Sequence, residues 1–138
     1  RVSLQDKARP SEDFVFKHLA QKNYLNGTRY YPSPEVFLYF LSRFVRDYDK
    51  ANSRFGDLLI QELKQRENIT EPFLDFAFRV AAMNNLGISN PQHKRKIIEH
   101  QNANGSLPAG SFFKYGSSNL FFGGEPLSTA VAIRALVC

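Results

Sequence analysis

The feature that most constrains this sequence is an alternation of half-apolar and almost wholly apolar helical segments. Six segments begin with helix-start signals, such as a Ser or Asn cap or a Pro in the first turn. The amphipathic segments cover about 11–23, 54–66 and 91–101, and the apolar ones cover about 34–45, 71–87 and 125–138. A helix that is apolar on every side must be covered on every side. The alternation therefore predicts an all-α fold with two layers, in which the apolar helices are inside and no strand is present.

The three pairs of segments also resemble one another. The amphipathic segments end in Gln21, Gln65 and Gln101. Each apolar segment has an arginine eight or nine residues after its first glutamate, and these arginines are Arg43, Arg79 and Arg134. Weak self-similarity of helical hairpins is typical of a repeat array. An ordinary helical bundle with accidental similarities is the alternative.

Length and composition indicate one domain over residues 1–138, with residues 1–9 as an extended tail before the first helix. Hydrophobic residues make up 43% of the chain and charged residues 22%, which is typical of a globular protein. No apolar run is long enough for a transmembrane helix, and no signal peptide is recognised, so a cytoplasmic location is expected. The single cysteine, Cys138, excludes an internal disulfide.

The net charge of +5 is spread thinly over the sequence. One dense basic cluster covers 94–96, between His93 and His100. We interpret this cluster as the solvated face of a helix, with contact to phosphate or acidic lipid as the alternative. No nucleic-acid-binding motif is present, so a nucleic-acid partner is not expected.

The stretch 96–106, which contains Gln101, Asn104 and Gly105, is similar to the Gln-x(2–5)-Gly-x-Trp repeat of terpenoid cyclases and protein prenyltransferases. Residues 125–136 resemble the inner helix that follows that repeat. The resemblance implies an α/α toroid, in which an inner ring of helices lies within an outer ring. It also implies that Gln101 ties an outer helix end to a neighbouring helix start, whereas a solvated glutamine is the alternative. The sequence departs from the repeat at Leu107, which replaces the aromatic residue, and the chain contains no tryptophan.

Three helical hairpins would make about half of such a ring, and the inner face would then be exposed. We therefore expect either that this chain is part of a longer protein or that it completes the ring as a homo-oligomer.

The resemblance also implies that an acidic residue could be catalytic. Class II terpenoid cyclases protonate an alkene with the middle acid of an Asp-x-Asp-Asp motif, but Leu127 occupies that position here. Two weak catalytic candidates remain. Glu125 is more simply a first-turn acid that favours the helix dipole. Asp75 lies near the start of an apolar helix and is expected either to pair with Arg79 or to face a cavity with a raised pKa.

Metal and cofactor sites are not expected. The histidines fall on amphipathic segments without ligand spacing, and the zinc ligands of protein prenyltransferases are not recognisable.

The segment 102–124 is unusually long for a connection and rich in aromatic residues. It is expected either to pack as part of the core or to cap one end of the ring and line an apolar pocket. The predicted lining residues of such a ligand site come from this segment and from the apolar helices: Phe37, Phe73, Leu127, Phe112, Phe113, Tyr115 and Phe121.

We therefore expect a degenerate cyclase-like domain that binds a hydrophobic, isoprenoid-like small molecule or a partner segment on its inner face, without catalysis. The alternatives are a cyclase-type enzyme whose acid lies outside this chain, and a helical interaction scaffold. The absent Asp-x-Asp-Asp motif disfavours the enzyme.

Overall fold

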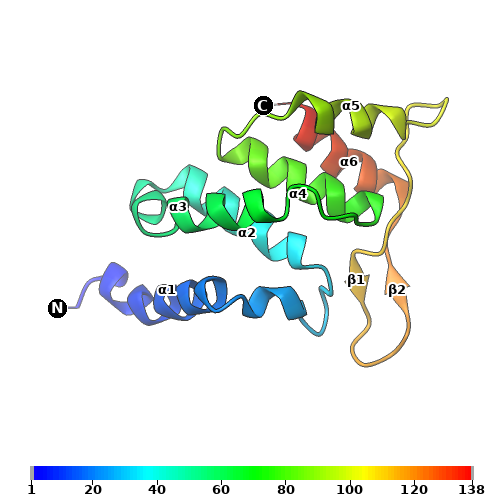
Figure 1. Ribbon diagram of the computed structural model, residues 1–138. Coiled ribbons are helices and arrows are strands. Elements are labelled where there is room, and N and C mark those ends of the chain that lie inside the picture. The colour runs from blue at the N-terminus through cyan, green and yellow to red at the C-terminus, as the bar shows by residue number, and fades with distance from the viewer. Residues whose placement is uncertain (1, 138) are drawn as a thin grey trace.

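A computed structural model describes residues 2–137 and confirms the all-α class (Figure 1). Cys138 lies outside the described residues. The elements are α1 (Leu4–Ala20), the short 3-10 helix η1 (Asn23–Asn26), α2 (Pro34–Asp47), α3 (Asp49–Gln65), α4 (Phe73–Asn85), α5 (Pro91–Glu99), β1 (Phe113–Lys114), β2 (Phe121–Phe122) and α6 (Glu125–Leu136). None of the helices within 2–137 is both long and apolar enough to cross a membrane.

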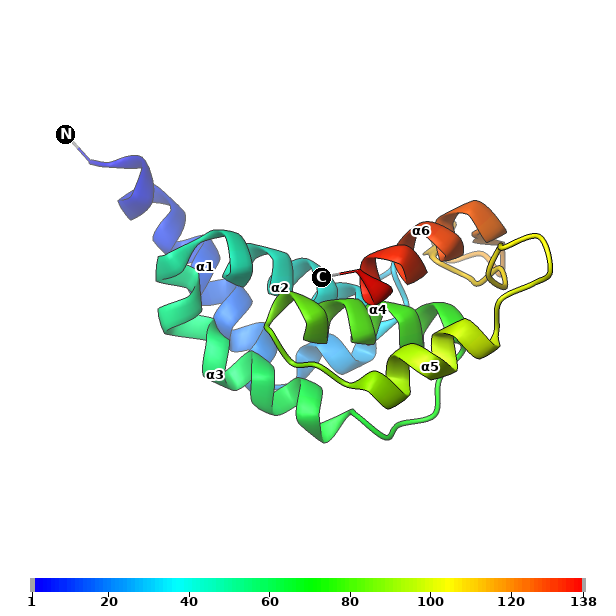
Figure 2. The same ribbon diagram turned by 90° about the horizontal axis from the view of Figure 1, so that it is seen from above.

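Helices α2, α4 and α6 lie side by side in a row, with α4 in the middle. Helix α3 packs against α2 and α4, and α5 packs against α4 and α6. Both lie on the same side of the row in Figure 2. Helix α1 packs against α3. The apolar segments thus form one layer, which is covered on one side by amphipathic helices.

The central position of α4 explains why it is apolar all round. Its residues from Phe76 to Met83 are all buried, because neighbouring helices cover it on both flanks. The other two apolar helices are not covered on every side, so that part of the prediction is wrong. Phe40 on α2 is 50% exposed and Ile133 on α6 is 55% exposed, since these helices form the ends of the row.

A buried asparagine joins the three helices of this row. Asn85, at the end of α4, donates from Nδ2 to Ser42 Oγ on α2 over 2.9 Å. Its Oδ1 accepts from Arg46 Nη1 on α2 over 2.8 Å and from Arg134 on α6. The three arginines that suggested a repeat therefore differ in role: Arg134 belongs to this network, Arg79 is buried elsewhere, and Arg43 is exposed.

The first helix begins earlier than the sequence indicated. Ser3 caps α1, because its Oγ accepts from the Asp6 backbone N–H over 3.1 Å. Pro10 lies inside the helix instead of preceding it. Residues 4–9 are therefore helical, and the extended tail expected over 1–9 is wrong for them. Helix α3 likewise begins at Asp49, directly after the one-residue junction at Tyr48.

The long segment 102–124 contains a short antiparallel pair of strands. Phe113 pairs with Phe122, and Lys114 pairs with Phe121. At its start, the Leu107 backbone N–H donates to Thr129 Oγ1 on α6 over 2.9 Å, and the Leu107 side chain is buried. The exposed Gln101 donates to the Gly105 carbonyl over 3.1 Å. It therefore closes its own turn, and the tie to a neighbouring helix start is not observed.

Candidate functional site

A cavity with a volume of about 640 Å³ lies between α1 and α2. The backbone of helix α1 lies close to that of α3 and not to that of α2. Helix α1 contacts α2 through the rings of His18 and Phe37, whose centroids are 5.0 Å apart. The space between α1 and α2 is therefore filled only in part. Its lining residues are Leu4, Gln5, Ala8, Ser11, Glu12, Val15, Phe37, Phe40, Leu41, Phe44, Tyr48 and Phe55.

The walls of this cavity are apolar and largely aromatic. Phe55 of α3 is completely buried, whereas Phe40 and Phe44 of α2 are 50% and 40% exposed. Half-exposed phenylalanine side chains beside a cavity can gain burial when an apolar molecule enters it. The cavity also has a volume within the range of about 300–1,000 Å³ that is common for small-molecule sites.

Polar side chains gather at the end of the cavity near the start of α1. Gln5 donates from Nε2 to the Tyr48 hydroxyl over 3.3 Å, and its Oε1 accepts from Lys50 Nζ over 3.1 Å. Farther along α1, near its middle, Arg54 of α3 lies close to Glu12 and pairs with Asp13. An open apolar cavity with a hydrogen-bonded polar group near one end suits an apolar molecule that carries one polar end.

The predicted ligand residues do not gather in one place. Of that set, Phe37 lines the cavity between α1 and α2. Phe73 contacts the His100 ring, with centroids 5.2 Å apart, and Leu127 packs against the buried residues of α2, α4 and α6. Phe112 stacks on Phe78 at 5.7 Å.

The other three residues of that set belong to the strand pair and its turn. Phe113 stacks on Tyr30 at 5.7 Å, while Tyr115 and Phe121 are 64% and 49% exposed. The segment 102–124 thus packs at its start and leaves its tip in solvent.

Asp75 lines a separate cavity of about 270 Å³ at the starts of α2 and α4. Burial raises the pKa of Asp75, and a hydrogen bond with Ser33 opposes that rise. The expected pairing with Arg79 is wrong, because Arg79 forms its ion pairs with Glu71 and Glu35. Asp75 lies four residues before Arg79 on the same helix, but the carboxylates of Glu71 and Glu35, from other segments, pair with Arg79 instead.

The second candidate acid, Glu125, is exposed in the first turn of α6. It lines an open hollow of about 500 Å³ that also includes Asn104 and Thr129. This position suits an acid that favours the helix dipole. Leu127, in the place of the cyclase acid, carries no proton to donate.

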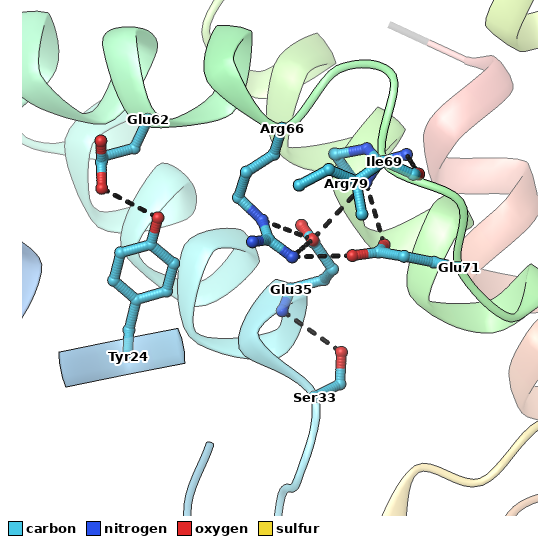
Figure 3. Close-up of polar contacts among 8 residues, drawn as sticks. All are labelled: Tyr24, Ser33, Glu35, Glu62, Arg66, Ile69, Glu71 and Arg79. Carbon is cyan, nitrogen blue, oxygen red and sulfur yellow. Dashed lines mark hydrogen bonds and ion pairs between the residues drawn. The ribbon is translucent and has the colours of Figure 1, made fainter. Parts of the chain in front are cut away.

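A buried cluster of two acids and two arginines lies where α2, α3 and α4 meet (Figure 3). Arg66 donates from Nε to Glu35 Oε1 over 2.7 Å and from Nη2 to Glu71 Oε1 over 2.7 Å. Arg79 lies 3.0 Å from Glu71 Oε2 through Nη1 and donates from Nη2 to the Ile69 carbonyl over 2.8 Å. Glu35 and Arg79 are 0% and 1% exposed. This cluster holds three helices together, which is a structural role.

Burial and the neighbouring Glu35 raise the pKa of Glu71 from its ordinary value of 4.5 to about 8. Sequence reasoning missed this cluster. Its signal was a charged residue, Arg79, inside a helix that is otherwise apolar all round, because such a charge requires buried partners.

Within residues 2–137, no group of three or more His, Cys, Asp or Glu side chains is placed to hold a metal ion.

No protein-family model matches this chain, and a search of the solved structures found no significant match. The chain is similar to the drimenol cyclase drtB of Aspergillus calidoustus, with 34% identity over 120 residues. The match covers 86% of this chain and 23% of the cyclase, so the chain spans about a quarter of the length of that relative. The helical domain is therefore related in sequence to part of a terpenoid cyclase.

Proposed function

We propose that this chain is a cyclase-like helical domain that binds an apolar, isoprenoid-like molecule in the cavity between α1 and α2. The observation that carries the proposal is the cavity itself, with a volume of about 640 Å³ and walls that include Phe37, Phe44 and Phe55. Aromatic and branched aliphatic walls favour a hydrocarbon ligand through burial of apolar surface. The similarity to a drimenol cyclase supports an isoprenoid as the class of ligand.

The polar end of the cavity supports a ligand with one oxygen-bearing end. Gln5 and the Tyr48 hydroxyl form one hydrogen-bonded group there, with Lys50 beside it. These side chains would orient the ligand, because its polar end would otherwise lose hydrogen bonds to water. The hydrocarbon part would then lie against Phe40 and Phe44 and cover them.

Binding without catalysis is the function that we favour. A class II cyclase reaction needs a proton donor in the position that Leu127 occupies here. The acids with a raised pKa, Glu71 and Asp75, do not line the cavity between α1 and α2. Glu12 is the acid that lines this cavity, so a catalytic role would require either Glu12 or an acid from another part of a longer protein.

The test is binding of farnesol by the purified chain, followed by native mass spectrometry and calorimetry. Ala8 lines the cavity from α1, whereas Ala20, at the end of the same helix, does not. Ala8→Trp would fill the cavity and is expected to weaken farnesol binding about tenfold or more, equivalent to about 1.4 kcal/mol. Ala20→Trp is the matched control and is expected to bind like the wild type.

Two outcomes would contradict this proposal. One is a monomer that takes up no farnesol. The other is binding that Ala8→Trp and Ala20→Trp weaken equally, because the ligand would then lie elsewhere. Dimerisation that Ala8→Trp abolishes, without farnesol binding, would instead assign the cavity to a partner segment.

A further inference from the structure

A second apolar surface lies on the strand pair and on the turn that supports it. We call it the hairpin surface and define it by six exposed residues on both faces of the strand pair and on the adjoining turn: Tyr30, Tyr31, Tyr115, Leu120, Phe121 and Phe122. Their side chains are between 38% and 64% exposed. Figure 1 shows β1 and β2 at one edge of the molecule, beside the turn that precedes α2.

The backbone fixes these side chains in place. The Lys114 N–H donates to the Tyr30 carbonyl over 2.8 Å, which joins β1 to the turn before α2. Phe113 stacks on Tyr30, and its ring centroid lies 6.1 Å from that of Phe122. The Tyr115 N–H donates to the Leu120 carbonyl over 2.9 Å and closes the tip. These residues are therefore exposed although hydrogen bonds and ring contacts hold the hairpin in place.

The charges on this surface are all positive. In residues 27–33 and 102–124, Arg29 and Lys114 are the charged residues, and neither segment contains an acid. The Arg29 guanidinium lies 5.8 Å from the centroid of the Tyr30 ring, and Lys114 Nζ lies 5.8 Å from that of Phe121. Neither cation forms an ion pair with a carboxylate in the described part of the chain. Both cations thus remain available beside exposed aromatic rings.

We propose that the hairpin surface docks on an anionic lipid bilayer. Aromatic side chains are favoured at the boundary between headgroups and acyl chains, where one side is apolar and the other is wet. Arg29 and Lys114 would then lie at the level of the lipid phosphates, and each basic side chain near an anionic surface strengthens attachment. The combination of exposed rings, flanking cations and absent acids favours a lipid surface over a protein partner.

The hairpin surface and the cavity share no residue, so variants of each site can be tested separately. The test is co-sedimentation of the chain with phosphatidylcholine vesicles, with and without phosphatidylserine. Binding is expected with phosphatidylserine and is expected to weaken as salt is added. Lys114→Glu is expected to reduce binding about fivefold or more. Leu120→Ser, at an exposed position, is expected to reduce binding without loss of helical circular dichroism.

Matched controls come from α5, on another part of the molecule. Arg95 is exposed, and Ile98 is 56% exposed. Arg95→Glu and Ile98→Ser are expected to leave vesicle binding unchanged. Loss of binding with these variants, and not with the hairpin variants, would place the contact at α5 and overturn the proposal. Absence of phosphatidylserine-dependent binding would also overturn it, as would self-association that Leu120→Ser abolishes in analytical ultracentrifugation.

Discussion

Arg66 at the C-terminus of α3 and Glu35 in the first turn of α2 form a buried ion pair, in which Arg66 Nε lies 2.7 Å from Glu35 Oε1. The Glu35 side chain is completely buried, so it depends on Arg66 and Arg79 for its charge to be tolerated. The pair joins a helix of the central row to the helix that covers it.

Removal of one partner from this pair should therefore be costly. Arg66→Met leaves a buried carboxylate short of a partner and is expected to lower the free energy of unfolding by about 3–5 kcal/mol. Arg95→Met, on the exposed face of α5, is the control and is expected to change it by less than about 0.5 kcal/mol. Urea denaturation measures both variants. If both variants change the free energy of unfolding by the same small amount, the ion pair does not stabilise the packing of the helices.

Stability should also depend on the protonation of Glu71. Its pKa is raised to about 8 in the fold, so the folded state binds more protons than the unfolded state between about pH 4.5 and pH 8. Stability from this group is therefore fully present below pH 4.5 and is lost as pH rises towards 8, by at most about 1.4 kcal/mol per pH unit. Asp75, whose pKa is also raised, contributes in the same direction.

Comparison of the wild type with Glu71→Gln isolates this effect. Burial lowers the pKa of His93, which favours the opposite trend in mildly acidic solution, but His93 is present in both proteins. We expect the stability difference between the two proteins to shift in favour of Glu71→Gln as pH rises from 5 to 8. A difference that does not change with pH would mean that Glu71 titrates normally.

Asn85 is expected to be as important as the buried ions, because it links α2 and α6 through α4. Asn85→Ala removes these hydrogen bonds, two of which involve charged groups, and is expected to cost about 2–3 kcal/mol in thermal or urea unfolding. Asn52→Ala, at an exposed position on α3, serves as the matched control. If both variants have the same free energy of unfolding, the hydrogen bonds of Asn85 do not stabilise the packing of α2, α4 and α6.

The base of the hairpin contains a contact that tolerates no side chain. A Cβ added at Gly123 would lie 1.7 Å from the Gly110 carbonyl oxygen, whereas a Cβ at Gly124 would have its nearest neighbour, Pro126 Cδ, at 3.6 Å. Gly123→Ala is expected to destabilise the strand pair by about 1–3 kcal/mol, and Gly124→Ala is expected to be tolerated. Hydrogen exchange at the Phe112 amide, which donates to the Phe122 carbonyl, should become faster in the first variant alone.

The sequence was most informative where burial follows from local pattern. The apolar positions of α4 predicted a helix covered on both flanks, and Asn90 predicted the start of α5, where its side chain caps the His93 N–H. The first helix was expected to begin at about residue 11, after Pro10, but Ser3 caps α1 and Pro10 lies inside it. The strands are two residues long, so they leave no alternation to recognise.

The candidate site could not be predicted to the same extent. The cavity lies between α1 and α2 because α1 packs against α3 and not against α2. No local sequence pattern specifies against which helix α1 packs. Phe37, from a helix that is apolar almost all round, lines the cavity, and its role as a ligand residue stays a prediction. Arg79 was assigned to Asp75 by helical spacing, but its partners come from segments that are distant in sequence or lie just before α4.

The most direct test of the proposed function is nuclear magnetic resonance of methyl-labelled protein with bound farnesol. Val15 and Leu41 line the cavity from its two helices, and Leu120 lies on the hairpin. The proposal predicts nuclear Overhauser effects from the farnesol methyl groups to both Val15 and Leu41. Effects confined to Leu120, or effects to none of these methyl groups, would contradict it.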